Sequence, residues 1–255
     1  MSLYLPWLDE RSVERSVAGG LVYRFPPVEA ALEEPDGLLC AGGDLTSGRL
    51  LSAYARGIFP WYSEGQPILW WSPDPRCLFL RGDLHVSRSL RRRMRRQMHS
   101  TRYRFTFDTD FAATMAACAN REETWITPEM LRAYQRLHTE GHAHSAELWH
   151  QADNDQWQLV GGLYGLALGR CFFGESMFSL ETDASKIVIT LLIEHLMDWG
   201  YHLLDCQVVS DHLRSLGARA LPREAFSRLL ETYAATDSAP PHQWTTNPAL
   251  LQNGS

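Results

Sequence analysis

Apolar and polar residues recur along this chain with two periods, one typical of strands and one of helices. Strands, some with an attached turn, are predicted at 76–87, 102–111, 142–150, 155–169, 170–179 and 201–209. Helices are predicted at 44–57, within 88–104, and at 110–120, 127–141 and 185–200. Three consecutive strands form an antiparallel meander and helices must cover the sheet, so the pattern predicts an α+β fold.

The segment SPDP at 72–75 marks a boundary between two parts of the chain. Two prolines so close together can continue neither a helix nor the hydrogen bonds of a sheet. We therefore expect a small N-terminal domain over 1–74 and a larger domain over 75–255. The first 25 or so residues have no clear periodicity and are expected to be irregular.

Three polar residues interrupt otherwise apolar strand segments. Glu175 lies in CFFGESMFS, and Asp205 and Gln207 lie in LLDCQVV. Residues two apart on a strand point to the same face, so Asp205 and Gln207 can touch one reactant. Burying an unpaired carboxylate costs several kcal/mol, so Asp205 needs a donor, and Gln207 is the nearest candidate. The alternatives are a strand end that faces water for the pair and a satisfied structural acid for Glu175.

The composition is that of a globular protein. With 255 residues and 45% hydrophobic content, the chain can bury a substantial core. Its apolar runs are shorter than the roughly 20 residues that cross a bilayer, and the N-terminus lacks the order of a signal peptide. The five cysteines are widely spaced and form no CxxC pair, so reduced thiols in the cytoplasm are expected.

Positive charge is concentrated in one segment. Residues 88–104, RSLRRRMRRQMHSTRYR, contain eight arginines and no acid, whereas the whole chain carries −6, which leaves −14 for the remainder. Arginine matches phosphate oxygens with a two-pronged fork, and so dense a cluster repels itself unless an anion is near. The pattern favours binding of a nucleic-acid backbone over the alternative, a solvated helix face. The residues concerned are Arg88, Arg91, Arg92, Arg93, Arg95 and Arg96.

Metal and nucleotide sites are not expected. His142 and His144 would share one face of a strand, but no cysteine or carboxylate stands at ligand spacing beside them. The phosphate loop of nucleotide hydrolases, the GxSxG nucleophile elbow and the HExxH zinc motif do not occur. We therefore expect a protein that uses neither a metal ion nor a cofactor.

Long and unusual blocks run through the chain from Phe25 to about Trp244. They are EPDGLLCAGGDL, AYARGIFPWYS, ILWWSPDPR, LHVSRS, TWIT, AYQRLHTEGHAHS, LVGGLYG, FFGESMFS, ASK and DCQVVSDHLRSLGA. Together they resemble the bacterial leucyl/phenylalanyl-tRNA–protein transferases. The blocks are specific enough to identify the chain as a member of that family.

The resemblance implies a reaction and a fold. Family members move Leu, Phe or sometimes Met from an aminoacyl-tRNA to the free α-amine of proteins that begin with Arg or Lys, which marks them for degradation by the N-end rule pathway. Their larger domain is similar to the GNAT acyltransferases and carries a smaller N-terminal domain. An aminoacyl ester is already activated, so its aminolysis needs no ATP, metal or acyl-enzyme.

The resemblance also implies roles for individual residues. DCQ gives Asp205 and Gln207 as the catalytic pair, and GES gives Glu175 as a further participant. In these roles the Gln207 side-chain carbonyl accepts a hydrogen from the attacking amine, while Asp205 orients that amide and stabilises the developing positive charge. Trp61 and Trp125 match the aromatics associated with the 3′-terminal adenosine.

An apolar pocket for the transferred amino acid is implied on the last long helix and the strands beside it. Ile189, Leu192 and Leu196 lie at i, i+3 and i+7 on one helix face, a stripe that core packing explains equally well. Pockets of this kind discriminate by only about 1–3 kcal/mol per methylene, so tolerance of Leu, Phe and Met is expected. The pocket residues implied are Leu163, Met177, Ile189, Leu192, Leu196 and Leu204.

One departure from the family pattern and two alternative functions stand beside this interpretation. Ser210 takes the place of a common Asn, which puts in doubt any role of that amide in holding the acceptor peptide. A coenzyme A-dependent acetyltransferase would share the fold, but the pyrophosphate loop of those enzymes fails at its last position in both candidate segments, 158–163 and 214–219. A non-catalytic tRNA-binding protein would explain the arginines and tryptophans but leaves Asp205 and Gln207 without a role.

Overall fold

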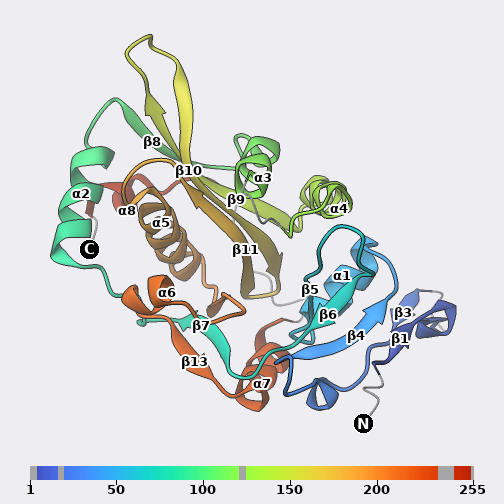
Figure 1. Ribbon diagram of the computed structural model, residues 1–255. Coiled ribbons are helices and arrows are strands. Elements are labelled where there is room, and N and C mark those ends of the chain that lie inside the picture. Colours follow the sequence, from blue (N-terminus) through green and yellow to red (C-terminus); the bar gives the residue numbers. More distant parts are fainter. Residues whose placement is uncertain (1–4, 17–19, 121–124, 235–243, 254–255) are drawn as a thin grey trace.

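The computed structural model of the protein describes residues 5–16, 20–120, 125–234 and 244–253. Within these ranges the strands form a seven-stranded sheet, a four-stranded sheet and a two-stranded hairpin. Figure 1 shows the large sheet in one half of the molecule and the small sheet beside it in the other. Helices on mostly antiparallel sheets confirm the expected α+β class. No helix in the described ranges has both the length and the apolar character needed to cross a bilayer.

The large sheet is built from the second part of the chain. Its strands are β7 (Arg76–Leu80), β8 (Tyr103–Phe107), β9 (Ala143–Gln151), β10 (Trp157–Leu168), β11 (Cys171–Ser179), β12 (Leu203–Asp205) and β13 (Arg219–Leu221). They lie in the order β13-β7-β12-β11-β10-β9-β8. Every neighbouring pair is antiparallel except β11 and β12, which are parallel. The expected meander is confirmed as β9, β10 and β11.

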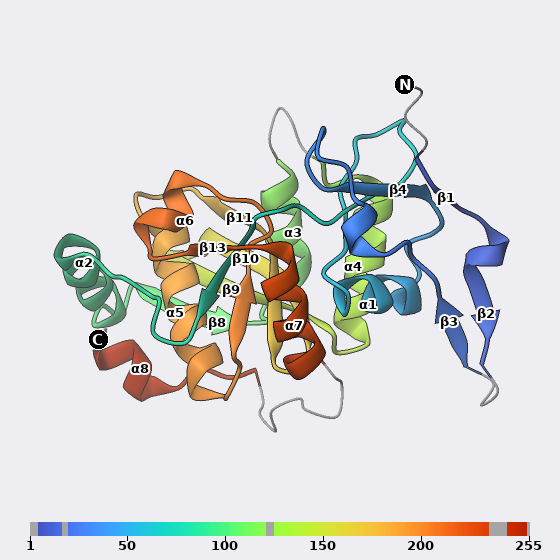
Figure 2. The ribbon, with the colours of Figure 1, turned by 90° about the horizontal axis from the view of Figure 1, so that it is seen from below.

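Helices cover both faces of the large sheet. They are α2 (Arg88–Met98), α3 (Phe111–Ala119), α4 (Pro128–Thr139), α5 (Ala184–Asp198), α6 (Asp211–Ser215), α7 (Arg223–Tyr233) and α8 (Pro248–Asn253). Figure 2 shows α2, α5 and α8 on one side of the sheet and α3, α4 and α7 on the other. Two hydrophobic clusters, one on each face, match this division, so the sheet separates two cores.

The N-terminal elements pack on the face that carries α3, α4 and α7. Trp70 and Tyr54 belong to the same hydrophobic cluster as Tyr134 and Phe226 from the larger part, so the two parts share a core. The early strands were not expected from the sequence, because segments of two or three residues are too short to show a period. The elements are β1 (Trp7–Leu8), η1 (Glu10–Ser12), β2 (Val13–Arg15), β3 (Leu21–Tyr23), η2 (Val28–Ala30), β4 (Leu38–Gly42), α1 (Ser47–Tyr54), β5 (Phe59–Pro60) and β6 (Leu69–Trp71).

Helix ends follow the signals in the sequence. The Thr127 hydroxyl accepts the Met130 N–H at 3.2 Å, and Pro128 opens α4, where its missing N–H costs nothing. Gly57 and Gly200 follow α1 and α5 with φ of +73° and +92°, a conformation that side chains with a Cβ rarely adopt. These local rules explain why the expected helices begin and end close to where the sequence placed them.

Strand β12 is shorter than expected, and this opens a gap in the sheet. The sequence predicted a strand over 201–209, but β12 ends at Asp205. The last residue of β11 that pairs with β12 is Phe173, and β11 continues to Ser179 without β12 beside it. Glu175 and Gln207 each follow that last pair by two residues, so they face the opening between the diverging chains.

Gly165 and Gly174 are paired across β10 and β11, beside this gap. Substitution of each glycine by alanine tests how closely the neighbouring groups pack there. A Cβ on Gly165 would overlap the Phe173 carbonyl oxygen and the Phe172 ring, whereas a Cβ on Gly174 would meet nothing nearer than 3.5 Å. Gly165→Ala should therefore lower the free energy of unfolding by about 2–3 kcal/mol. Gly174→Ala is the matched control, and urea denaturation of both variants would contradict this account if their midpoints shifted equally.

Candidate active site

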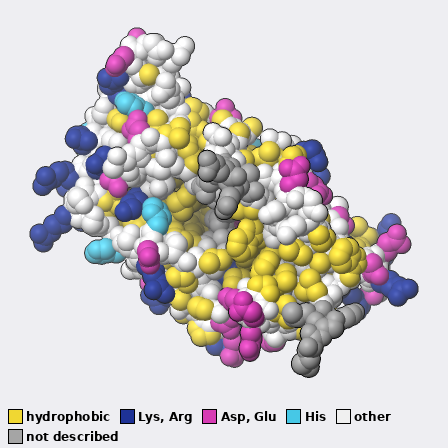
Figure 3. Space-filling view, viewed as in Figure 1, with side chains coloured by type: hydrophobic (Ala, Val, Ile, Leu, Met, Phe, Trp, Pro, Cys, Tyr) yellow, Lys and Arg dark blue, Asp and Glu magenta, His cyan; other side chains and the backbone are white. Residues whose placement is uncertain are grey.

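Two joined cavities occupy the gap between β11 and the chain that follows β12. Their volumes are about 320 and 290 Å³. Figure 3 shows the hollow at the centre of the face, bordered by hydrophobic side chains. The two cavities share four lining residues, namely Trp125, Glu175, Cys206 and Gln207.

The larger of the two, called the aromatic cavity below, lies between the two sheets. Its other lining residues are Phe59, Pro60, Trp61 and Val208. Trp61 is 43% exposed, and its backbone is fixed because its N–H donates to Leu69 O at 2.9 Å and its carbonyl accepts from Trp71 Nε1. The structure thus brings Trp61 and Trp125 to one cavity. Trp70, in contrast, is fully buried and donates to Gly42 O, so it packs the interior.

The second cavity, called the apolar cavity, is lined by side chains from the sheet, from α5 and α6, and from the chain that joins β12 to α6. Polar side chains, among them Ser176, Ser210 and His212, lie beside the apolar ones. Four of the six residues expected to bind the amino acid line it, namely Leu163, Met177, Ile189 and Leu204. The other two, Leu192 and Leu196, are fully buried in the core and are not among its lining residues. Only the start of the helical stripe therefore reaches the cavity, and its remainder packs the interior.

Asp205 is bound by an arginine that the sequence did not indicate. Arg76 at the start of β7 donates from Nε and Nη2 to the two carboxylate oxygens at 2.8 and 2.7 Å, and both residues are fully buried. Arg76 also donates to Gly57 O at 3.0 Å and lies between the rings of Phe59 and Phe226, 4.8 Å from each centroid. Such a bidentate, ring-sandwiched pair leaves Asp205 without access to either cavity.

Gln207 does not lie on a strand with Asp205, which corrects the expected geometry. Its φ is +55°, in the left-handed region, so the alternation of a strand does not apply. Two backbone bonds hold it there: its N–H donates to Asp205 Oδ1 at 3.1 Å, and its carbonyl accepts the Cys77 N–H at 3.1 Å. Gln207 is thus a donor to Asp205 through its backbone, not through its side chain.

The Gln207 side chain carries an unused donor. It is only 9% exposed, and within the described residues its amide nitrogen has no hydrogen-bond partner. A buried amide without a partner costs about 1–3 kcal/mol, so a bound molecule that accepts this hydrogen bond would recover that energy. The amide therefore marks the junction of the two cavities as a binding position.

Glu175 lies at the same junction and is held by two tyrosines. Tyr54 of α1 donates to Oε1 at 2.7 Å and Tyr134 of α4 to Oε2 at 3.0 Å, and the two hydroxyl groups also contact each other. Burial raises the pKa of Glu175 to about 7, although both tyrosine hydrogen bonds act in the opposite direction. The tyrosine partners come from distant segments, and no spacing in the sequence pointed to them.

The arginine helix α2 forms a basic surface away from the cavities. Figure 3 shows its side chains projecting at the edge of the molecule. Arg93 is engaged, because its Nε lies 3.0 Å from the Asp183 carboxylate. Arg91 is partly buried beside Glu194, whose pKa burial raises to about 7. The exposed members of the six are Arg88, Arg92, Arg95 and Arg96.

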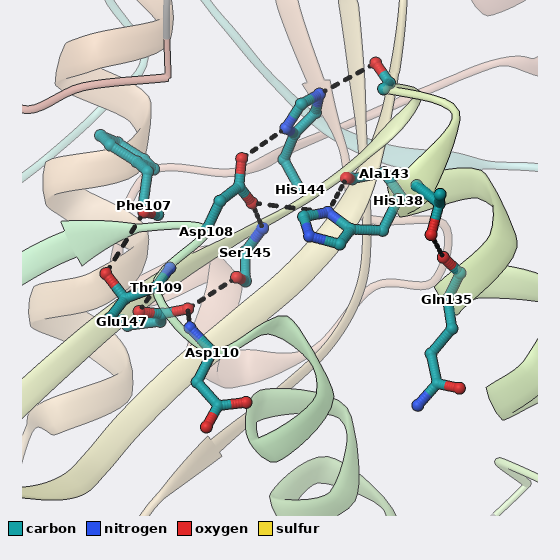
Figure 4. A network of polar contacts seen from close by, with 12 residues as sticks. Phe107, Asp108, Thr109, Asp110, Gln135, His138, Ala143, His144, Ser145 and Glu147 are labelled. Carbon is teal, nitrogen blue, oxygen red and sulfur yellow. Dashed lines mark hydrogen bonds and ion pairs between the residues drawn. The ribbon is translucent and has the colours of Figure 1, made fainter.

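A histidine cluster lies elsewhere on the sheet (Figure 4). His142 precedes β9, so it does not share a strand face with His144 as expected. His144 instead lies with Asp108 and His138, and their ligand atoms are within 4.8 Å of one another. The polar atoms are engaged internally: His144 Nδ1 bonds Asp108 at 2.7 Å, His144 Nε2 bonds Gly141 O at 3.2 Å, and His138 Nδ1 bonds Ala143 O at 2.8 Å. These bonds describe a structural network.

Ser210 has a clear local role at the start of α6. Its hydroxyl accepts the Leu213 N–H at 3.3 Å and caps α6, and the residue lines the apolar cavity. A serine cap satisfies the helix end as an asparagine would.

Two models of one protein family match this chain. The family model "Leucyl/phenylalanyl-tRNA protein transferase" matches residues 77–231, and the model for the N-terminal domain of that family matches 43–74. A solved structure described as FemX aligns with a TM-score of 0.44 and 10% identity over 72% of this chain and 71% of its own, too weakly to support an argument.

Two curated relatives carry the name leucyl/phenylalanyl-tRNA–protein transferase. The protein from Pseudomonas syringae pv. tomato is 54% identical over 89% of this chain and 92% of its own length. The protein from Hahella chejuensis is 50% identical over 96% of this chain and 97% of its own. The chain therefore belongs to the leucyl/phenylalanyl-tRNA protein transferase family and is an aminoacyltransferase.

Proposed function

We propose that the protein transfers Leu, Phe or Met from aminoacyl-tRNA to the α-amine of proteins that begin with Arg or Lys, and so marks them for degradation. The observation that carries this proposal is the meeting of an aromatic and an apolar cavity at Gln207 and Glu175. An aminoacyl-adenosine has the same two parts, an aromatic base and an amino-acid side chain, joined at the ester that reacts. The site therefore fits the reactive end of the donor.

The aromatic cavity holds the 3′-terminal adenosine. Trp61 and Trp125 both line it, and stacking of a base on an aromatic side chain contributes about 1–3 kcal/mol. Trp61 is fixed by two backbone hydrogen bonds, so little conformational entropy is lost when a base stacks on it.

The apolar cavity receives the side chain of the transferred residue. Its lining offers aliphatic side chains and one flexible methionine, Met177. A thioether side chain adapts its shape to different occupants, which suits acceptance of Leu, Phe and Met by one pocket.

Gln207 acts on the reacting centre, and Asp205 positions it. The unpartnered amide N–H of Gln207 donates to the ester carbonyl as negative charge develops on its oxygen, and the amide carbonyl accepts a hydrogen from the incoming amine. Asp205 is buried against Arg76 and reaches this chemistry through the Gln207 backbone N–H. Asp205 is therefore a positioning residue in this scheme, which moves it from the catalytic role that the resemblance implied.

The α2 arginines hold the tRNA backbone. Their basic surface lies on a chain whose remainder carries −14, so a polyanion is attracted to one region and repelled elsewhere.

We also infer a GNAT-like large sheet, two domains divided near 74 and a cytoplasmic location. The single parallel pair in the large sheet, the separate small sheet and five free cysteines support these inferences.

The direct test is incubation of the protein with radiolabelled leucyl-tRNA and peptides that differ only in their first residue. Label should appear in peptides that begin with Arg or Lys and not in those that begin with Asp or Gly. A protein that binds the tRNA and transfers no label would be a tRNA-binding protein, and the proposed reaction would be wrong.

Replacement of Gln207 by Ala should slow transfer at least tenfold with little change in tRNA affinity, because its amide acts on the reacting centre. Val22→Ala is the control, since Val22 lies on β3, is 46% exposed and lines neither cavity. Single-turnover rates and filter binding measure the two quantities.

Asp205→Asn should slow transfer too, but it should also lower the free energy of unfolding by about 3–5 kcal/mol, because the buried Arg76 charge loses its partner. Full stability in this variant, or a wild-type rate for Gln207→Ala, would contradict these roles.

Ile189→Ala should favour phenylalanyl-tRNA over leucyl-tRNA several-fold, because it enlarges the apolar cavity by about three methylene groups. Leu196→Ala makes the same kind of change on the same helix but lies in the core. It should cost about 2–5 kcal/mol of stability and leave the substrate ratio unaltered. The measurement is the ratio of kcat/KM for phenylalanyl-tRNA to that for leucyl-tRNA. If only Leu196→Ala changed this ratio, Leu196 and not Ile189 would belong to the pocket.

Changing Arg88, Arg92 and Arg96 to Gln should raise KM for aminoacyl-tRNA strongly. Each lost phosphate contact should flatten the slope of log affinity against log salt by roughly 0.7–0.9. Transfer from a minimal aminoacyl-adenosine should stay nearly normal, since that donor has no acceptor-stem phosphates.

Arg15→Gln compared with Arg92→Gln gives a charge-matched control, because Arg15 is exposed on β2 at the opposite end of the molecule (Figure 2). Equal losses with both donors, or equal salt slopes for the two single variants, would rule out docking on α2.

A further inference from the structure

Glu175, Tyr54 and Tyr134 form three oxygen–oxygen contacts in a closed ring. Each pair is within hydrogen-bond distance: Tyr54 with Glu175 at 2.7 Å, Tyr134 with Glu175 at 3.0 Å, and the two tyrosines with each other. Every contact needs one proton between its oxygens. The two phenols supply two protons, so one contact lacks a proton when Glu175 is ionised.

A protonated Glu175 completes the ring. The carboxylic acid supplies the third proton: one of the two tyrosine–Glu175 bonds then reverses, with Glu175 as its donor, and each of the three groups donates once and accepts once around the cycle. Both tyrosines are fully buried, so water does not reach their hydroxyl groups to supply a missing hydrogen bond.

We propose that this ring stores one proton on Glu175 in the resting enzyme and that Glu175 delivers it to the 3′-oxygen of the leaving adenosine. The inference rests on the proposed function, because it assigns the proton for that same transfer. In this proton transfer Glu175 is the catalytic residue, and Tyr54 and Tyr134 are positioning residues. The location fits, since Glu175 lines both cavities and thus lies where the ester is held.

With this assignment, every proton that one group loses in the reaction is gained by another. The neutral amine attacks the ester carbonyl and forms the C–N bond, and the C–O bond to the adenosine breaks as Glu175 gives its proton to that oxygen. The nitrogen, now positively charged, passes one proton to the Glu175 carboxylate. The amine has lost one proton, the adenosine 3′-oxygen has gained one, and Glu175 is again neutral. An alkoxide is a poor leaving group, which is why a positioned acid accelerates this step.

The surroundings of the ring favour the neutral acid. Burial raises the pKa of Glu175 to about 7, the nearby Asp205 charge acts in the same direction, and the Arg76 charge opposes it. An acid with a pKa near the working pH is best suited to give and regain a proton. The titratable and charged groups around the ring are Asp205, Arg76, Tyr164, Cys206 and His212.

The ring also joins three separate segments of the chain. Tyr54 comes from α1, Tyr134 from α4 and Glu175 from β11. The protonation of Glu175 therefore depends on how the N-terminal elements pack against the larger part, and a displaced α1 would release a carboxylate into the site.

Infrared spectroscopy of the full chain between pH 5 and 9 tests the stored proton without any substrate. We expect the carbonyl bands of protonated carboxylic acids, lost with a midpoint near pH 7. The band of Glu175 should be absent in Glu175→Gln, whereas Glu194, whose pKa burial also raises to about 7, should keep its own band in that variant. In Tyr54→Phe and Tyr134→Phe the band should shift, because the acid loses one ring partner. Tyr164→Phe, another fully buried tyrosine beside the ring, should leave the band in place.

Glu175→Gln separates proton delivery from a structural role. Its amide can donate once and accept once, so the ring stays closed, but it has no proton to transfer. We expect a rate lower by on the order of a hundredfold with the fold intact, and loss of the decline in wild-type rate above about pH 7.

Thermodynamic linkage provides an independent check. Glu175 keeps its proton up to about pH 7 in the folded chain but ionises near 4.5 when unfolded. The unfolding free energy of the wild type relative to Glu175→Gln should therefore fall as the pH rises between these values and be constant above them.

The inference would be overturned if no acid band at pH 5–6 disappeared in Glu175→Gln, or if that variant kept the wild-type rate. A wild-type enzyme that shows the band but transfers no label would refute the proposed function and leave the stored proton established.

Discussion

The buried ion pair between Arg76 and Asp205 is the interaction on which the site depends. Removing two charges from water costs several kcal/mol per ion, and two parallel charge-assisted hydrogen bonds offset that cost only when the geometry is fixed. Here the geometry is fixed from several directions, since the guanidinium also binds Gly57 O and lies between the rings of Phe59 and Phe226. This one cation on β7 thus joins β12 to α7 and to the N-terminal layer.

Most of the architecture could be predicted from local rules, whereas the site geometry could not. Period and capping placed the meander and the main helices, because these signals lie within a few residues of the elements that they govern. The partner of Asp205 lies 129 residues away, and the alternation in LLDCQVV hides a left-handed residue at Gln207. A charge count likewise cannot tell that Arg93 already has Asp183 as its partner while Arg92 is exposed.

Some polar groups of the site have hydrogen-bond partners within the protein, and one does not. Asp205 and the backbone of Gln207 have their partners within the protein, so they need no reorganisation when a substrate arrives. The Gln207 amide nitrogen has none among the described residues, and it faces the place where the two cavities meet. A site built in this way supplies fixed dipoles at the moment of reaction, which is the electrostatic form of catalysis that an activated ester requires.

Helix α5 separates two demands that often conflict in enzymes. Ile189 lines the apolar cavity, whereas Leu192 and Leu196 pack the interior without reaching it. One stripe therefore contains a residue that faces a cavity and two residues that pack the core. Natural variation, or a designer who seeks a cavity of a different shape, can change Ile189 while Leu192 and Leu196 keep the stability that tolerates such changes.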